Sequence, residues 1–529
     1  MKKSHILVLL FFLFSYLYSY SCTNLIVTPK ASEEGATYVA YLNDGEWLNH
    51  LNKKEVRKYN PGAKVQFTSL NGKEYEIPQV SKTYGTLGFI ANDQGLVIGE
   101  TTFVGRLELW NKNNPVKYWE LMELVLQRCK TAREAILTIN EICNKYGYGS
   151  EGECFSIADA NEAWVMNLIG KGEGEKGAVW VAQRIPDGCV YATANYARIT
   201  SFPLVDPENC LYAPDVISFA IGKGYYNPKK DGEFHFNKAY NPATTEILRY
   251  SETRVWSIFR RVNSTMKFSE AYHRGKNPRG EYPLWIKPDN PLSFEEIKSL
   301  IRDHYEGTNY DMTKGLAAGP FETPFRVSPI TFKKTKKYSY GWERPISVPF
   351  TCFSFISELR KDVPYFMKAK IWYSVGDTYT NVFTPLYAGC EQTPKAYRTG
   401  NINEYNPEVA WWNFKFIANY INLRYSCMIK DVKNEQKRIE EELYRANKLT
   451  EKVVLNLDHK KGLKILENHS QAMIDTVLCS WKKLQYRLIS KYNDGYVKDS
   501  NNKITRNPYP EYWLKTVEKL EENRVKFKK

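Results

Sequence analysis

The alternation of hydrophobic and polar positions in the first part of the chain predicts paired β-strands. Residues 22–44 contain two runs rich in β-branched and aromatic residues, separated by a polar turn that carries Gly35. A second pair of runs occupies 83–103 and turns at 92–95, where the sequence reads Asn-Asp-Gln-Gly. Further runs of this kind lie within 154–197. These segments predict antiparallel hairpins near both ends of the first 200 residues.

Helical periodicity separates the two groups of hairpins. Within 118–146, large aliphatic residues recur at spacings of three and four, as one face of an amphipathic helix requires. Thr131 followed by Glu134 forms a capping-box pattern, which marks the start of a second helix inside this segment. The order of hairpins, helices and hairpins predicts an α+β protein in which helices cover antiparallel sheets.

The second half of the chain changes from mixed segments to long helices. The pattern predicts helices at 244–261 and 293–304, strands at 348–358 and 369–375, and helices at 406–448, 451–492 and 509–527. Ser293 is the expected N-cap of its helix. We therefore expect a main domain over 22–400 and a helical C-terminal region over 401–529, packed on the main domain or appended to it.

The N-terminus has the pattern of a secretory signal peptide. Two lysines precede an apolar run over 6–17, and Ser19 and Ser21 place small residues at positions −3 and −1 before Cys22. The run is short for a membrane span, which needs about 20 apolar residues, so an uncleaved anchor is the weaker alternative. We expect residues 1–21 to be removed as a signal peptide and the protein to be exported, into the periplasm or the medium.

Composition narrows the class of protein further. Without residues 1–21 the chain keeps 508 residues, enough for a large core, and its net charge falls from +15 to +13. No basic run forms a patch for nucleic acid, and export makes that partner improbable. CxxC, HExxH and GxSxG motifs are absent, so we expect no metal and no cofactor. Nine cysteines follow Cys22, an odd number, and their pairing cannot be read from the sequence.

A cysteine at a mature N-terminus carries a nucleophile and a base on one residue. The ordinary pKa of an α-amine is about 7.7–8.0 and that of a thiol about 8.5, so the amine can accept the thiol proton without a histidine. Cleavage after Ser21 would then activate the protein. A cysteine after a signal sequence is also a lipid acceptor in membrane-tethered proteins. The bulky Tyr20 and the lack of a polar linker after Cys22 argue against lipidation.

Several segments resemble one enzyme family. They are, in order, CTNLIVTPKASEEGATYVAYLND, GFIANDQGLVIGETTF, CFSIADANEAWVMNLIGK, VWVAQRIPDGCVYATAN and IRDHYEGTNYDMTKGLAAGPFETPFR. These segments resemble the N-terminal-nucleophile (Ntn) cysteine dipeptidases of the dipeptidase A type, which are relatives of secernins, penicillin V acylases and bile-salt hydrolases. The resemblance covers nearly all of the mature chain. It implies an Ntn-hydrolase αββα sandwich, cysteine-type hydrolysis of short peptides, and no metal.

The resemblance also implies roles for single residues. Cys22 matches the nucleophile, Asp44 matches the acid that holds the α-amine and tunes its pKa, and Asn195 matches the amide that donates to the oxyanion from a strand. Two positions depart from the wider superfamily. Tyr41 stands where many members have an arginine, and Thr102 stands near the place of a second oxyanion asparagine.

Three further residues are candidates for substrate binding, namely Tyr41, Glu100 and Thr102. The Tyr41 hydroxyl can hydrogen-bond the thiolate or the substrate, and Glu100, on the strand of Thr102, can pair with a substrate ammonium. Asp303 and His304 form a catalytic pair by residue type, but an N-terminal nucleophile needs no such pair, and we expect structural roles for both.

The expected function is that of an exported dipeptidase that cleaves small peptides through an acyl-enzyme on Cys22. One alternative is an amidase that acts on non-peptide acyl amides, as penicillin V acylases and bile-salt hydrolases do. Another is a non-catalytic lipoprotein anchored at Cys22. Because Tyr41 lacks the charge of the usual arginine, a further alternative is a member of the family with weak or no activity. The sequence does not decide whether the protein forms a homo-oligomer.

Overall fold

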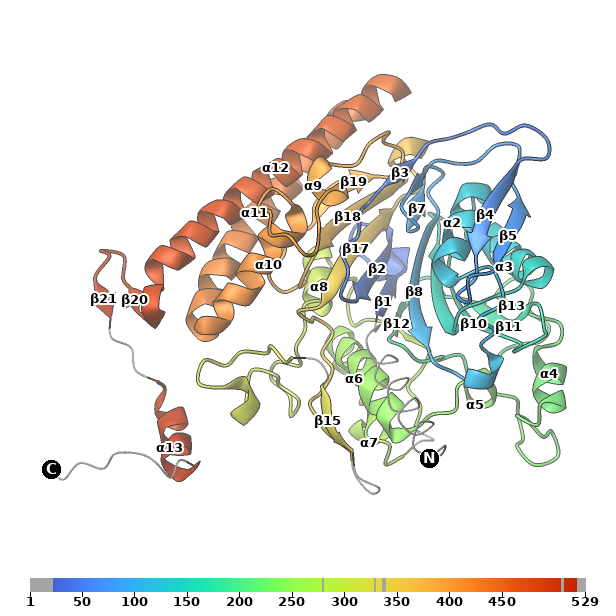
Figure 1. The fold of residues 1–529 in the computed structure, drawn as a ribbon, viewed down its shortest axis with the longest axis horizontal. Coiled ribbons are helices and arrows are strands. Elements are labelled where there is room, and N and C mark those ends of the chain that lie inside the picture. The colour runs from blue at the N-terminus through green and yellow to red at the C-terminus, as the bar shows by residue number, and fades with distance from the viewer. Residues whose placement is uncertain (1–21, 278–279, 328–329, 335–338, 506–508, 521–529) are drawn as a thin grey trace.

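Two large antiparallel sheets form the centre of the molecule (Figure 1). The computed structural model describes residues 22–277, 280–327, 330–334, 339–505 and 509–520. The fold is mixed α+β, with long helices toward the C-terminus, as the sequence pattern predicted. The signal peptide expected at 1–21 lies outside the described residues and stays a prediction.

The first sheet holds the N-terminal strand in its interior. In the described chain it has seven strands, in the order β14 (Trp285–Ile286), β12 (Val190–Thr193), β1 (Thr23–Val27), β2 (Thr37–Asp44), β17 (Thr351–Leu359), β18 (Ala369–Val375) and β19 (Thr384–Tyr387). β1 pairs antiparallel with β12 on one side and with β2 on the other. Cys22, directly before β1, therefore lies at the end of a strand that is hydrogen-bonded on both sides.

The second sheet contains the strands that the sequence predicted between 83 and 184, whereas the run predicted at 189–197 forms β12 of the first sheet. Among the described residues the second sheet has eight strands, in the order β13 (Cys210–Tyr212), β11 (Ala178–Arg184), β10 (Ala163–Gly170), β9 (Gly152–Ala158), β8 (Val97–Phe103), β7 (Ala91–Asn92), β6 (Thr86–Leu87) and β3 (Lys53–Lys54). The predicted hairpin at 83–103 is broken into three strands, because β6 and β7 are only two residues long.

The two sheets pack face to face, and a glycine lets them approach closely beside the candidate site. Ile26 and Val39 of the first sheet share one hydrophobic core with Ile98 of the second. At Gly99, on β8, a Cβ atom would lie only 3.3 Å from the Cβ of Tyr41, closer than ordinary carbon–carbon contact. Glycine at this position allows β2 to lie against β8.

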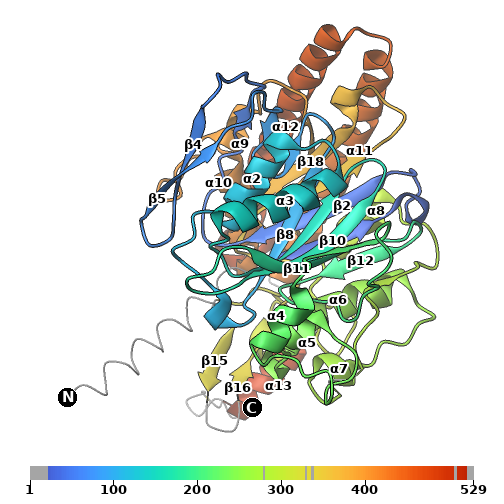
Figure 2. The same cartoon turned by 90° about the vertical axis from the view of Figure 1, so that its right-hand side faces the viewer.

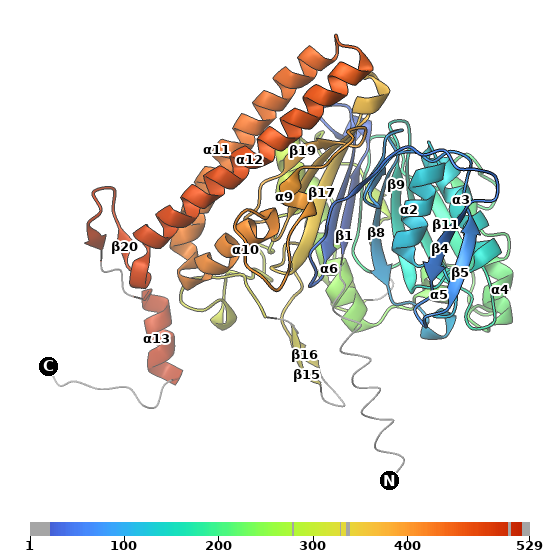
Figure 3. The same cartoon turned by 45° about the horizontal axis from the view of Figure 1, so that its top comes forward.

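Helices cover the outer faces of both sheets (Figures 2 and 3). α2 (Tyr118–Arg128) and α3 (Ala132–Tyr146) pack on the eight-stranded sheet, as Figure 2 shows. α6 (Thr245–Val262) and α8 (Phe294–Leu300) pack on the seven-stranded sheet, in a core shared with β1 and β2. The predicted capping box of Thr131 is confirmed, because its side chain accepts from the N–H of Glu134.

The C-terminal helices lie against the other end of the seven-stranded sheet. The predicted helix over 406–448 is interrupted: α10 (Ala410–Tyr420) ends before α11 (Tyr425–Val454) begins, because Arg424 has the non-helical angles φ −155° and ψ 61°. α12 (His459–Lys491) runs antiparallel to α11 and contacts β19 (Figure 3).

Other predicted elements hold with shifted ends. The helix expected at 293–304 ends at Leu300, although Ser293 caps it as expected. A hairpin of β4 (Lys64–Thr68) and β5 (Glu74–Pro78) was not predicted. Of the helix expected at 509–527, α13 (Glu511–Leu520) is present, and 521–527 lies outside the described residues.

None of the described helices combines the length and the apolar character that crossing a membrane requires.

Candidate active site

Cys22 lies buried where the two sheets meet. Only 2% of the residue is exposed. Its Sγ atom is 3.8 Å from the hydroxyl of Tyr41, on β2, and donates to Oε1 of Glu100, on β8, at 3.6 Å. The structure thus brings the predicted nucleophile together with two of the three predicted substrate-binding residues, one from each sheet.

A directed chain of hydrogen bonds surrounds the thiol. The hydroxyl of Tyr41 donates to Oε1 of Glu100, and the side-chain amide of Asn43 donates to the Tyr41 oxygen at 2.6 Å. The same amide nitrogen lies 3.9 Å from Sγ. Since the hydroxyl proton is used on Glu100, the Tyr41 oxygen is the acceptor from Asn43. Negative charge in this chain therefore resides on Glu100.

Glu100 belongs to a buried pair of acids with Glu153, on β9. Both residues are fully buried. Thr102 donates from its hydroxyl to Glu153 at 2.9 Å and lies 3.5 Å from Glu100. Burial raises the pKa of both carboxyl groups, and the charge of Glu100 raises the pKa of Glu153 further, well above its ordinary value. Two such groups do not both ionise near neutral pH, so Glu153 holds the proton.

Asp44 contacts the Cys22 thiol through its backbone, whereas its carboxylate is bound to Arg344 and Thr351. The N–H of Asp44 donates to the Cys22 sulfur, which lowers the pKa of the thiol. The carboxylate is fully buried, forms an ion pair with Arg344, and accepts from the hydroxyl of Thr351 at 2.6 Å. Burial raises the pKa of Asp44, and Arg344 opposes that rise. The predicted contact with the α-amine stays a prediction.

Asn195 is fixed just beyond the end of β12, two residues after Thr193, rather than within the strand as expected. Its backbone adopts φ 58°, the left-handed region that asparagine tolerates. The side-chain amide donates to the carbonyl of Thr102 at 2.7 Å, and its oxygen accepts from Arg254 at 2.8 Å. The amide has a second N–H, which is the group an oxyanion role would use.

Arg254, on α6, was not identified from the sequence. Its guanidinium donates to the carbonyl oxygen of Cys22 at 2.8 Å and to the hydroxyl of Thr23 at 2.9 Å. Burial, and next the charge of Arg344, lower the pKa of Arg254 to about 10, so it remains charged at neutral pH. Many members of the superfamily have an arginine where this chain has Tyr41, and β2 contains no arginine. In this structure Arg254 brings a fixed positive charge to the site from α6.

The environment of Cys22 favours the protonated thiol. Burial raises its pKa most, and the charges of Glu100 and Asp44 raise it further. The Asp44 N–H and the Tyr41 hydroxyl act in the opposite direction, with smaller effect. The thiol therefore needs a base at the moment of attack, which is the task that the sequence assigns to its own α-amine.

Asp303 and His304 lie apart from this cluster. Asp303 accepts from Ser257 at 2.6 Å and pairs with Arg261 at 3.4 Å, and His304 contacts Glu306 at 3.1 Å. The contacts of Asp303 tie the loop after α8 to α6, whereas the contact of His304 stays within that loop; the structural role expected for both residues stays a prediction.

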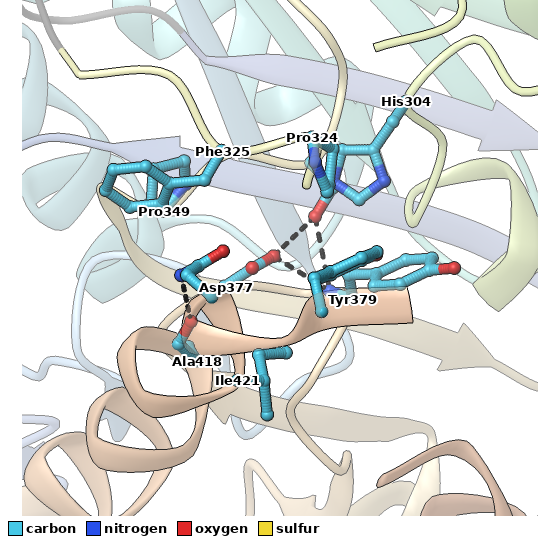
Figure 4. A pocket seen from close by; sticks show the side chains of 11 residues that line it. His304, Pro324, Phe325, Pro349, Asp377, Tyr379, Ala418 and Ile421 are labelled. Atoms are coloured by element: carbon cyan, nitrogen blue, oxygen red, sulfur yellow. Dashed lines mark hydrogen bonds between the residues drawn. The ribbon is translucent and has the colours of Figure 1, made fainter. Parts of the chain in front are cut away.

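A pocket beside His304 shares no lining residue with the Cys22 cluster (Figure 4). Asp377 lies on its wall and accepts from the hydroxyl of Ser347 at 2.6 Å and from the backbone N–H of Tyr379 at 3.0 Å. The carboxylate of Asp377 is thus already bonded to other residues of the wall.

The cysteines and acids of the described chain form neither a disulfide nor a group suited to a metal ion. All ten cysteines fall within the described residues, and none of them forms a disulfide there. Within the same residues, no three His, Cys, Asp or Glu side chains are arranged to hold a metal ion.

Four residues of the site escaped the sequence analysis, namely Asn43, Glu153, Arg254 and Arg344. For Asn43 a signal existed, because residues 41 and 43 of one strand share a face. Arg254 interrupts the apolar face of a predicted helix, which is a weak signal. For Glu153 and Arg344 we find no signal in the sequence, because their partners are distant in the chain.

The fold and the site together define a class of cysteine enzyme. The thiol of Cys22 begins an interior strand between two antiparallel sheets, and hydrogen-bond partners from β2, β8 and α6 converge on this residue. Residues 21–438 match the family described as Peptidase family C69. The chain belongs to this family, in agreement with the resemblance found in the sequence.

Several relatives are similar to this chain over most of their length. Dipeptidase A of Lactobacillus helveticus is 25% identical over 488 residues, which cover 86% of this chain and 93% of that protein. A probable dipeptidase of Latilactobacillus sakei is 24% identical over 470 residues, covering 85% and 92%. A probable dipeptidase of Salmonella dublin is 24% identical over 387 residues, covering 70% and 81%.

Proposed function

We propose that the protein is an exported cysteine-type dipeptidase built as an Ntn-hydrolase αββα sandwich. The observation that carries the proposal is the place of Cys22: it begins an interior strand, and its thiol is surrounded by polar groups from both sheets. The helices on the outer faces of the two sheets support the sandwich. The names of the relatives, dipeptidase A and probable dipeptidase, support the substrate class.

The first half of the reaction forms an acyl-enzyme. The Cys22 thiol gives its proton to the free α-amine of the same residue, and Sγ attacks the carbonyl carbon of the peptide bond. The second N–H of Asn195 stabilises the oxyanion. The bond between carbon and nitrogen then breaks, and the α-ammonium gives its proton to the leaving amino acid.

The second half releases the acyl group. A water molecule loses a proton to the α-amine and attacks the thioester carbon, and the bond from carbon to Sγ breaks. The proton returns to the thiolate, which restores Cys22. Arg254 holds the Cys22 carbonyl, so it fixes the backbone from which both the amine and the thiol project.

A substrate panel tests this proposal. The mature protein is incubated with dipeptides, with conjugated bile acids and with penicillin V, and the released amino groups are measured. We expect hydrolysis of dipeptides and inactivation by thiol alkylation. Hydrolysis of the bile acids or of penicillin V alone would favour the amidase alternative instead.

Export and activation are one event in this proposal. A free α-amine at Cys22 requires cleavage after Ser21, which is the cleavage site that the signal pattern predicts. A protein that keeps residues 1–21 has an amide nitrogen in place of the base and is expected to be inactive.

A further inference from the structure

The Glu100 carboxylate is buried beside the nucleophile without a cationic partner. Its hydrogen-bond partners are Tyr41, Cys22, Thr102 and the protonated Glu153, all of which are neutral groups. Among the described residues, no lysine, arginine or histidine forms an ion pair with Glu100. A buried charge is costly unless it is paired, so Glu100 is suited to bind a cationic group of the substrate.

Of the two buried acids, Glu100 is the one that carries the charge. It accepts hydrogen bonds from the Tyr41 hydroxyl, the Cys22 thiol and the Thr102 hydroxyl. The pKa of Glu153 is raised more strongly than an isolated buried acid would require, because the charge of Glu100 adds to burial. Glu153 therefore stays protonated and leaves one negative charge, next to Sγ.

The distance between Sγ and Glu100 specifies where a bound cation lies on the substrate. In an amino acid, the nitrogen and the carbonyl carbon are about 2.5 Å apart. A thiol in position to attack lies about 3–3.5 Å from that carbon, and an ammonium lies about 2.7–2.9 Å from a carboxylate oxygen. The substrate nitrogen, its carbonyl carbon, Sγ and Oε1 can therefore be the corners of one quadrilateral, whose fourth side is the observed 3.6 Å between Sγ and Oε1.

A dipeptide has one peptide bond and one free α-ammonium. An ammonium bound to Glu100 therefore belongs to the residue whose carbonyl is attacked, and the second residue leaves as a free amino acid.

We propose that Glu100 binds the free α-ammonium of the substrate, so that Sγ attacks the carbonyl of the amino-terminal residue. This inference rests on the proposed dipeptidase function and names its selectivity: the acyl group left on Cys22 is a single amino acid with a free amine. A blocked amino terminus removes the charge and adds bulk at a buried oxygen. N-acylated peptides are therefore not substrates.

Binding to a variant without the nucleophile tests the selectivity directly. The mature C22A protein is titrated by calorimetry with a dipeptide and with its N-acetyl form. We expect the free dipeptide to bind about 10- to 100-fold more tightly, the range for a hydrogen bond to a charged group. Equal affinities, or no binding of the free dipeptide, would overturn the inference without any change at Glu100.

The assignment to Glu100 is tested by three glutamate variants in the same background. E100Q keeps the size and the hydrogen bond with Tyr41 and is expected to abolish the preference for the free dipeptide. E153Q replaces the protonated partner and is expected to keep the preference. E151Q, which removes a nearby half-buried acid outside the contacts of Cys22, is the matched control and should also keep it. Loss of the preference in E153Q but not in E100Q would overturn the assignment.

Failure of the proposed function gives a different result. If the wild-type mature protein hydrolyses no dipeptide of a broad panel, the dipeptidase proposal fails. If it hydrolyses free and N-acetylated dipeptides equally well, the protein is a dipeptidase, but Glu100 does not select substrates by their free α-ammonium.

Discussion

The Cys22 sulfur lies 3.6 Å from the Glu100 carboxylate, and both groups are buried. Each group therefore alters the ionisation of the other. After burial, the charge of Glu100 is the largest cause that raises the pKa of the thiol. In the proposed complex, a substrate ammonium neutralises this charge, so binding itself eases the loss of the thiol proton.

Removing the Glu100 charge should make the thiol more acidic. A negative neighbour raises the pKa of a thiol, so its removal lowers that pKa, and the thiolate forms at lower pH. We expect the pH at which iodoacetamide alkylation of Cys22 reaches half its maximal rate to be lower in E100Q than in wild type. Mass spectrometry of the labelled peptide measures the rate, and E151Q serves as the control. An unchanged or higher midpoint would contradict the coupling.

The nucleophile is tested by two substitutions at one position. Cys22→Ala should abolish hydrolysis and leave the circular dichroism spectrum unchanged. Cys22→Ser should keep at most a small residual rate, because a hydroxyl is a much poorer nucleophile than a thiol near neutral pH. Turnover in the alanine variant at the wild-type rate would place the nucleophile elsewhere.

Asn195→Ala should lower kcat about 100- to 1,000-fold, the range for one lost oxyanion donor, with little change in KM. The proposed hydrogen bond forms only with charge that develops in the transition state. The variant also loses the bonds to Thr102 and Arg254, so its melting temperature is measured beside its kinetics. A rise in KM at constant kcat would mean that Asn195 only shapes the site.

Asp44→Asn should both destabilise the fold and shift the pH–rate profile. The substitution removes the carboxylate from a buried ion pair with Arg344, which costs about 3–5 kcal/mol. It also changes the charge that the sequence assigns to tuning the α-amine. Thr351→Val, which removes a neutral bond to the same carboxylate, is the control and should cost about 1 kcal/mol. If Asp44→Asn lowers stability but leaves the profile in place, the carboxylate has a structural role alone.

The mature N-terminus should be an unmodified Cys22. The proposed base is its free α-amine, and the residues before it have the pattern of a cleavage site. N-terminal sequencing and intact mass of the exported protein distinguish a free cysteine from a lipid-modified one. A different first residue, or a lipid on Cys22, would remove the base and with it the mechanism.

The sequence by itself was sufficient for the local elements and for the place of Cys22 directly before a strand. Alternating patterns fixed the hairpin of β1 and β2, and the capping box at Thr131 located the start of α3, because both signals arise between residues close in the chain. The same locality placed Cys22 directly before a strand. Tyr41 and Glu100 were recognised as candidates by type, without their contacts.

Only the tertiary structure decided how these residues act on one another. Glu100 reaches Cys22 because β8 packs against β2 at Gly99, and Arg254 reaches the Cys22 carbonyl because α6 covers the seven-stranded sheet. Local patterns do not encode such long-range contacts, because side-chain periodicity tells which face is buried but not what lies opposite it. Whether a buried acid is paired with a cation, shares a proton or stays charged depends on that opposite surface, and so it is settled by packing alone.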